Sequence, residues 1–276
     1  MDMEIFFAPL HIVYMLIPLF LVTLLYLLFK NRPKRVKKTV VLVIAILNTL
    51  QHILKPYIYP QYFGESLGAR STAYNMCALL ILISPIVIAI GSELWQNFMF
   101  YVGSIAGYSS ILVTYWLASP VEEQIRFVIC HGLLFLSSFL PLLFGIYKIN
   151  YRKFWRIPFV FFACLGVLII SNMINFILGI AGDTGDLTLL EFLYRENPCW
   201  AMCPPAGYPF VLDIISPFTP SAFLSAKGGV DTPILWYALP LFVFITAAGF
   251  ILGIILDAKH FIKDLKRIFT EKNQGE

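Results

Sequence analysis

Long apolar segments dominate this sequence and limit what it can fold into. A helix needs roughly 20 apolar residues to cross the hydrocarbon of a bilayer. Strands are excluded, because these segments are too long for strands and lack an alternation of apolar and polar residues. Seven segments meet the requirement, over about 10–29, 39–58, 73–91, 98–117, 127–147, 157–180 and 234–256. We therefore expect an all-α polytopic membrane protein, built as a bundle of seven transmembrane helices.

The composition points to the same class. Of the 276 residues, 59% are hydrophobic and only 13% are charged, and the mean hydropathy is +0.80. Soluble domains carry about 25% charged residues, so this chain cannot cover itself with polar surface. A soluble enzyme, a disordered chain and a nucleic-acid-binding protein are thereby excluded. We expect a transmembrane domain over 1–256, with a long outer loop over 181–233, and a tail over 257–276.

The basic residues predict how the chain is oriented. Fifteen of the 20 Lys and Arg residues fall in the first connection, the fifth connection and the C-terminal tail. With seven spans these three regions share one side of the membrane, which the excess of positive charge identifies as the cytoplasmic side. The N-terminus is then outside and the C-terminus inside. Short loops and small size indicate a bacterial plasma membrane.

The tail and the cysteines carry weaker signals. Phe261, Leu265 and Ile268 recur at helical spacing in a basic tail, which predicts an amphipathic helix that binds anionic lipid. Cys199 and Cys203 lie in the outer loop, where a local disulfide is one possibility. No second pair of ligands lies near them, so we expect no zinc, no other metal and no cofactor.

Polar side chains within the spans form the candidate site. Amide and imidazole groups are costly in hydrocarbon and usually face the interior of a bundle. With a rise of about 1.5 Å per residue, all of them fall in the outer half of the membrane. We expect them to line one site that opens toward the outer leaflet. They are Asn48, Gln51 and His52 in the second segment, Asn75 and Cys77 in the third, His131 in the fifth, and Asn172 and Asn175 in the sixth.

Cys77 and His131 suggest a chemistry for this site. Both lie roughly 6 Å inside the outer boundary. A cysteine beside a histidine indicates nucleophilic catalysis, in which the imidazole takes the thiol proton and the thiolate attacks an acyl carbonyl. Amide N–H groups would hold the resulting oxyanion. The same histidine also suits a structural role, as a hydrogen-bonded residue of the bundle.

Several short motifs resemble the YwaF-like bacterial integral membrane proteins. That family opens its third span with a segment of the type P-L-H-L-C, matched here by Ala-Tyr-Asn-Met-Cys at 73–77. Its later histidine corresponds to His131 in Cys-His-Gly-Leu-Leu. The end of the sixth segment and the start of the last also resemble the family, through Asn172, Asn175, Gly179 and Thr-Pro-Ile-Leu-Trp-Tyr at 232–237. Eukaryotic relatives include a transmembrane acyltransferase that makes polyunsaturated ether phospholipids, and androgen-induced membrane hydrolases are more distant.

The resemblance implies an activity as well as a fold. It implies that Cys77 accepts an acyl group as nucleophile, that His131 acts as its base, and that the partner is a membrane phospholipid or another acyl lipid. The chain departs from the family in having Asn75 where the family has histidine, and the N-Y pair after the sixth span is not intact. Two further hypotheses remain: a transporter or channel whose cargo binds the polar set, and a heptahelical receptor.

Overall fold

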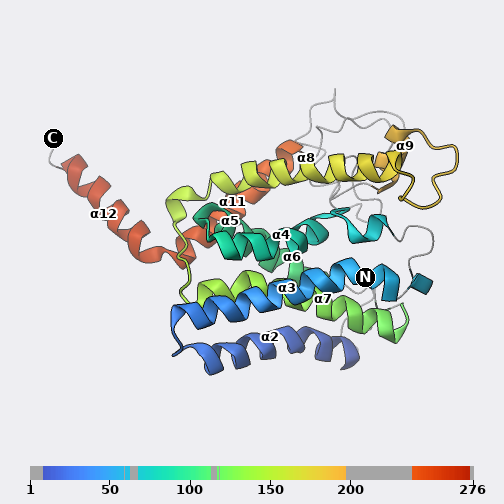
Figure 1. Ribbon diagram of the computed structural model, residues 1–276. Coiled ribbons are helices and arrows are strands. Elements are labelled where there is room, and N and C mark those ends of the chain that lie inside the picture. Colours follow the sequence, from blue (N-terminus) through green and yellow to red (C-terminus); the bar gives the residue numbers. More distant parts are fainter. Residues whose placement is uncertain are drawn as a thin grey trace.

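The computed structural model describes residues 9–58, 60–62, 68–112, 117, 119–196 and 238–273. Every regular element within these ranges is a helix, as expected for an all-α protein. Most of the helices run side by side along one common direction (Figure 1). In chain order the long helices are α2 (Pro9–Phe29), α3 (Lys34–Ile58), α4 (Met76–Ile90), α7 (Val121–Leu143), α8 (Arg156–Ile177), α11 (Ala238–Leu256) and α12 (Ala258–Asn273).

Four of these helices are long and apolar enough to cross a membrane: α2, α3, α7 and α8. The bent pair α11 and α12, which turns by 95°, adds a fifth candidate. The helix α4 is apolar but shorter, with 15 residues. The chain from Glu93 to Leu112 is helical in three consecutive pieces, α5 (Glu93–Phe98), the π-helical η4 (Met99–Ser104) and α6 (Ile105–Leu112). The chain is therefore an integral membrane protein with several apolar helices.

Some helices begin at positions other than those predicted, and charged residues account for two of these differences. The helix α3 starts at Lys34, directly after Pro33, rather than at about 39. Likewise α7 starts at Val121, after Pro120, rather than at about 127. Hydropathy excludes the charged first turns of both helices. Yet Lys and Arg, in the first turn of α3, and Glu, in the first turn of α7, are good helix formers, and Pro is well tolerated at a helix start.

Two other predicted spans move along the chain. The third begins at Met76 rather than 73, because the Asn75 side chain accepts a hydrogen bond from the Ala78 amide, 2.9 Å away, and so caps α4. The fourth begins at Glu93 rather than 98, and its described part ends at Leu112.

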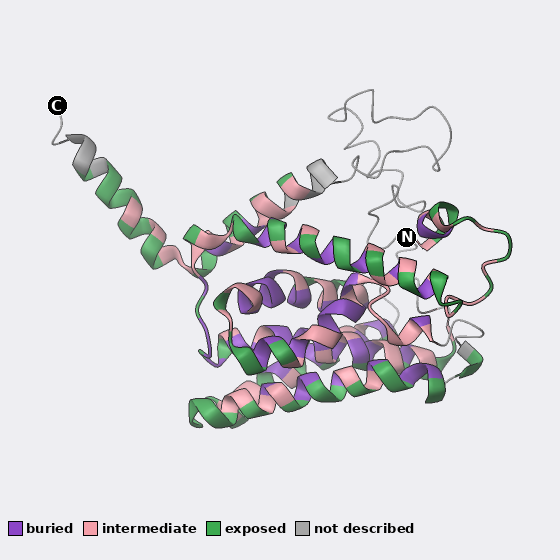
Figure 2. Ribbon diagram, turned by 45° about the horizontal axis from the view of Figure 1, so that its top comes forward, coloured by how far each residue is buried: buried purple, intermediate pink, exposed green. Residues whose placement is uncertain are grey.

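The helix α7 forms the centre of the bundle. It packs against α2, α3, α4, α6 and η4. Its residues Leu134 and Leu140 are fully buried. Outer helices instead leave large apolar side chains exposed, among them Phe20 of α2 at 65% (Figure 2). Such a surface is unfavourable in water and is the surface expected of a protein surrounded by lipid.

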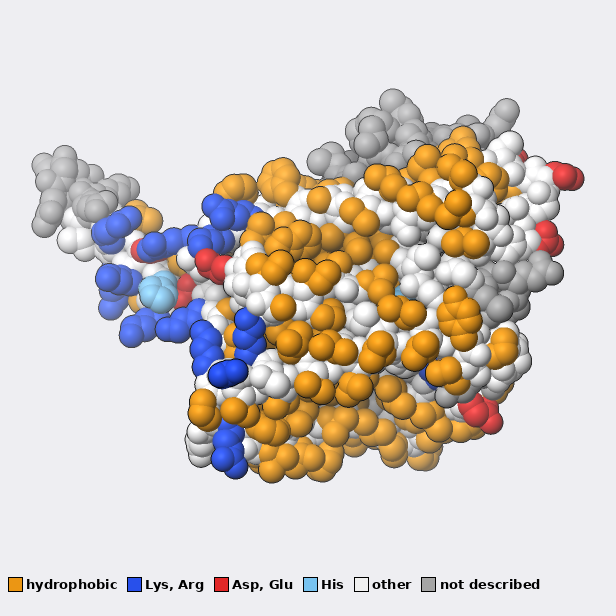
Figure 3. All heavy atoms as spheres, viewed as in Figure 1, with side chains coloured by type: hydrophobic (Ala, Val, Ile, Leu, Met, Phe, Trp, Pro, Cys, Tyr) orange, Lys and Arg blue, Asp and Glu red, His pale blue; other side chains and the backbone are white. Residues whose placement is uncertain are grey.

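The two ends of the bundle differ in charge. The α2–α3 turn, the α7–α8 connection and the α11–α12 bend lie together at one end (Figure 1). Lys and Arg side chains gather at this end, here called the basic end (Figure 3). The three basic regions of the sequence are therefore also neighbours in space. The predicted outer loop is described only to residue 196, so Cys199 and Cys203 lie outside the described residues.

Candidate functional site

The predicted polar residues lie toward the end of the bundle opposite the basic end. They come from α3, from the segment 69–75 that leads into α4, and from α7 and α8. Four of the eight donate to backbone carbonyl groups of a neighbouring element. Three sets can be distinguished: His52 and the asparagines of α8 hold the segment before α4, Asn48 and Gln51 join α3 to α7, and Cys77 and His131 lie near the place where α4, α6 and α7 meet.

His52 joins α3 to the segment before α4. Its Nε2 lies 3.1 Å from the carbonyl oxygen of Thr72, and its Nδ1 lies 3.2 Å from Nζ of Lys55. A carbonyl only accepts, so Nε2 donates and Nδ1 accepts from the ammonium group. Lys55 is only 4% exposed and also lies over the ring of Tyr74, at 5.1 Å. Lys55 therefore does not extend to the surface of the bundle, because polar partners on its own helix and on the next segment draw it inward.

The two predicted asparagines of α8 hold the same segment from the other side. Asn172 donates to the carbonyl of Tyr74 at 3.0 Å and to that of Leu168 at 2.9 Å. Asn175 donates to the hydroxyl of Thr72 at 2.9 Å. Both side chains are buried. Together with His52 they fix the position of the segment that ends at the cap residue Asn75.

Asn48 and Gln51 connect α3 to α7. The Asn48 amide donates to the carbonyl of Cys130 at 3.1 Å, and the Gln51 amide donates to that of Arg126 at 3.3 Å. The oxygens of both amides, Oδ1 and Oε1, are buried without a hydrogen-bond partner in the described structure. An unpaired buried acceptor carries a desolvation cost of about 1–3 kcal/mol. These two oxygens thus keep an unused capacity to accept a hydrogen bond.

Cys77 lies in the first turn of α4 and is partly buried. Its thiol lies within reach of the Ser110 hydroxyl on α6 and close to Cys130 on α7. Cys130 and Cys164 are buried in the apolar core, where they pack against apolar side chains. Ser110, whose hydroxyl donates to the Ala106 carbonyl at 2.7 Å, is a candidate site residue that sequence reasoning missed, because a serine in an apolar span gives no signal of its own.

His131 has an orientation suited to accepting a proton. Its Nδ1 lies 3.0 Å from the carbonyl of Phe127, so Nδ1 carries the hydrogen and Nε2 has the free lone pair. The ring also lies against that of Phe127, with centroids 4.0 Å apart. No hydrogen bond joins His131 to Cys77 among the described interactions. Catalytic hydrogen bonds are often long in empty sites and shorten when substrate binds.

The helix α6 contacts the parts of the chain that hold Cys77 and His131. At Gly107 an added Cβ would lie 2.9 Å from the His131 carbonyl and 2.8 Å from the Phe135 amide, so α6 and α7 cross there in backbone contact. Ser110 follows Gly107 by three residues and therefore lies on the same face of α6. The backbone of α7 at His131 therefore lies against the same face of α6 that carries Ser110, about one helical turn away.

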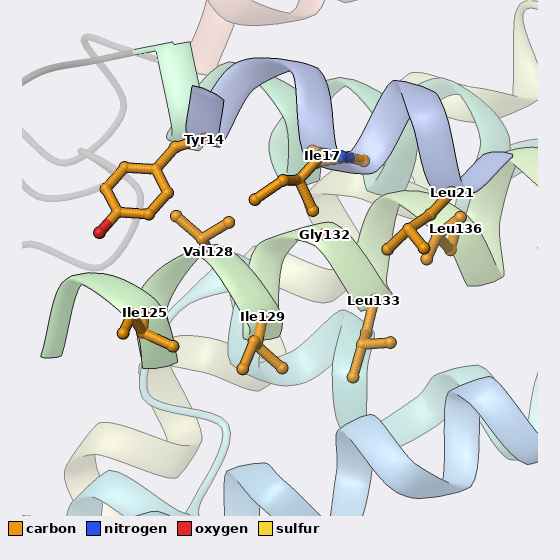
Figure 4. Close-up of a pocket in the computed structure, with 10 residues that line it drawn as sticks. Tyr14, Ile17, Leu21, Ile125, Val128, Ile129, Gly132, Leu133 and Leu136 are labelled. Atoms are coloured by element: carbon orange, nitrogen blue, oxygen red, sulfur yellow. The ribbon is translucent and has the colours of Figure 1, made fainter. Parts of the chain in front are cut away.

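An apolar groove runs along the outside of α7 near this point (Figure 4). It has a volume of about 180 Å³ and lies between α2 and α7. Gly132, directly after His131, forms part of its wall (Figure 4). Pro18 of α2 lies opposite, 3.6 Å from the position that a Cβ on Gly132 would take. Nearly all of its surface is hydrocarbon side chain, with Tyr14 at the end toward the candidate site.

Comparisons with known proteins identify the family. No curated protein and no solved structure matches the chain. The model of the TMEM164 family matches residues 6–253. This match covers nearly the whole chain and leaves out only the last three residues of α11 and all of α12 among the helices described above. The chain therefore belongs to the TMEM164 family, a family of transmembrane proteins.

Proposed function

We propose that this protein is a membrane-embedded lipid acyltransferase, or a lipid hydrolase, with Cys77 as nucleophile and His131 as base. The observation that carries the proposal is that the Cys77 thiol lies beside Ser110 while the His131 backbone lies beside Gly107, on the same face of α6. The free Nε2 of His131 supports it further. The resemblance to YwaF-like proteins remains a prediction and is consistent with the same activity.

We also propose seven crossings with the N-terminus outside, in a bacterial plasma membrane. The helix α4 and the run α5–η4–α6 would provide the third and fourth crossings. Residues Glu93–Leu112 form a rod of about 30 Å, the thickness of the hydrocarbon layer. The gathering of Lys and Arg at the basic end supports a cytoplasmic position for that end (Figure 3).

The proposed reaction has two steps. His131 Nε2 takes the Cys77 proton, and the thiolate adds to the carbonyl carbon of a lipid ester. The ester C–O bond then breaks, the leaving alcohol receives the proton from His131, and an acyl thioester remains on Cys77. In the second step an acceptor alcohol gives transfer and water gives hydrolysis. Either acceptor loses its proton to His131, and Cys77 regains it.

The environment of this pair offers places for a lipid substrate. The free oxygens of Asn48 and Gln51 would accept hydrogen bonds from polar groups of the lipid. The groove between α2 and α7 would hold a stretch of acyl chain, since its walls are apolar and open to the surrounding lipid. In this proposal His52, Asn75, Asn172 and Asn175 shape the substrate site by positioning the segment that leads to Cys77.

A transporter or channel is the second candidate. The observation that favours it is the pair of buried, unpaired oxygens on Asn48 and Gln51, which a polar cargo would satisfy. The other predicted polar side chains are already bonded within the protein, which leaves few groups for cargo. Covalent labelling separates the two candidates, because transport forms no bond to Cys77.

The test uses purified protein in lipid discs that contain a phospholipid with a radiolabelled acyl chain. We expect label on the protein that hydroxylamine releases, as a thioester requires. Cys77→Ala and His131→Ala should both lose it, by at least about a hundredfold, because a nucleophile and its base act as a unit. Cys130→Ala and Cys164→Ala are matched controls and should keep it. Label that persists in Cys77→Ala, or that resists hydroxylamine, contradicts the proposal.

A further inference from the structure

The helix α12 leaves the bundle at the basic end, where one side of the helix contacts the α7–α8 connection. It follows α11 after a bend of 95° (Figure 1). Asp257, at the bend, accepts from the amide of Tyr151 at 3.3 Å. Asp264 accepts from the guanidinium of Arg152, at 2.7 Å from Nε, and from the Tyr151 hydroxyl. The rings of Phe261 and Tyr151 meet edge to face, 5.4 Å apart. We call these interactions the tail contact.

The tail contact changes the charge that α12 presents. Asp257 and Asp264 are the only acidic residues from 257 to 268. Their side chains are only 11% and 15% exposed, because both are turned toward the α7–α8 connection. The basic side chains of the same stretch are all exposed: Lys259, Lys263, Lys266 and Arg267. Docking therefore removes the negative charge from the exposed surface of α12 and leaves the positive charge in place.

The exposed surface of α12 also has an apolar stripe. Ile262, Leu265 and Ile268 are 50%, 42% and 57% exposed. Their spacing of three residues places them along one side of the helix, next to the side that makes the tail contact. Lysines flank this stripe. A cationic helix with an exposed aliphatic stripe has the character of helices that lie in the headgroup region of anionic membranes.

We propose that α12 binds the anionic lipid surface of the membrane leaflet at the basic end, through the Ile262, Leu265 and Ile268 stripe and its flanking lysines. The charge of the helix favours this partner, because the exposed charged side chains between Ala258 and Ile268 are all basic. The tail contact holds the first part of α12, as far as Asp264, beside the α7–α8 connection, where lipid headgroups would meet the bundle. The rest of the helix projects away from the bundle (Figure 1). This inference is independent of the proposed chemistry at Cys77.

The experiment compares the full-length protein in lipid discs of phosphatidylcholine alone with discs that also contain phosphatidylglycerol. Hydrogen exchange of the amides from Lys259 to Ile268 reports binding. We expect slower exchange in the anionic discs and loss of the difference at high salt. Each basic residue near an anionic surface contributes on the order of a fivefold effect on binding. The triple variant Lys259→Gln, Lys263→Gln, Lys266→Gln should therefore lose most of the difference.

Two further variants keep the result interpretable. Replacing the same three lysines by arginine should preserve the difference between the two lipids, because charge and helix propensity are retained. Replacing Ile262 and Leu265 by serine should weaken protection in anionic discs while the exchange of α7 amides stays unchanged. Equal exchange in both lipids, or a difference that survives in the glutamine variant, overturns the proposal.

Discussion

The two ends of this bundle use polar groups in opposite ways. Around His52 and Asn172, buried side chains donate to backbone carbonyls of the segment before α4. At the basic end, Arg152 and Asp264 form a side-chain pair in which the arginine is 57% exposed. A buried hydrogen bond is costly to break, because its partner is left unpaired away from water, whereas an exposed ion pair is readily replaced by solvent. The contacts around His52 and Asn172 should therefore keep one geometry, whereas the contacts at the basic end can break and re-form.

The largest effect in this comparison should come from Gly107→Ala, where α6 meets α7. The added Cβ would lie 2.8 Å from a backbone atom, which cannot move without separating the helices. We expect a loss of about 3 kcal/mol or more, the upper end of the cost of overpacking, because the obstructing atoms belong to the backbone; it is measured as a lower melting temperature in detergent. Gly166→Ala on α8 is the control, since nothing lies within 4 Å of its Cβ position. Equal melting of the two variants would show that α6 and α7 are not in backbone contact.

A smaller effect should follow from Asn172→Leu. This variant removes the side-chain donor to the carbonyls of Tyr74 and Leu168. The Leu168 carbonyl keeps its backbone bond within α8, whereas the Tyr74 carbonyl loses the donor from α8. We expect a loss of about 1–3 kcal/mol in the free energy of unfolding. The matched control is Thr23→Val, whose exposed hydroxyl bonds only to its own helix at Leu19. If the control loses as much stability as Asn172→Leu, the contrast between buried and exposed polar groups fails at this end of the bundle.

The smallest effect is expected at the tail contact and should depend on pH. Hydrogen bonds from Arg152 and Tyr151 lower the pKa of Asp264 from 3.8 to about 2. A lowered carboxyl pKa stabilises the docked tail above the ordinary pKa, and this contribution is lost as the pH falls from about 4 to about 2. Exchange of α12 amides, corrected for the intrinsic pH dependence, should rise over that window. In Asp264→Asn the step should vanish, while melting of the bundle stays nearly unchanged.

The sequence predicts the class of fold better than it predicts the site. Long apolar runs suffice to place α2, α3, α7 and α8, because hydrophobic length is a local property. The predicted starts of α3 and α7 lie several residues too far along the chain, because a hydropathy profile does not count charged residues as part of a helix. The burial of Lys55 could not be predicted from the sequence, because it depends on Tyr74 and on the segment around Thr72 lying nearby in space.

Contacts between residues far apart in the sequence could not be predicted for other residues either. The partner of Asp264 lies 112 positions earlier in the chain, at Arg152. The place of Ser110 beside Cys77 likewise depends on how α4 packs against its neighbours. By contrast, the shared faces of Asn48 with Gln51 and of Asn172 with Asn175 follow from helical spacing, and the structure confirms that each pair bonds to one neighbouring segment.

The cap at Asn75 has a consequence for any charge that forms on Cys77. Peptide dipoles in a helix add up, so the beginning of α4 carries the equivalent of roughly half a positive charge. Cys77 is the second residue of this 15-residue helix. An anion placed there gains about 0.3–1 kcal/mol when exposed and up to about 2 kcal/mol when partly buried. The direction in which α4 runs thus supplies a thiolate, or the oxyanion that follows it, with a positive potential that no charged side chain has to provide.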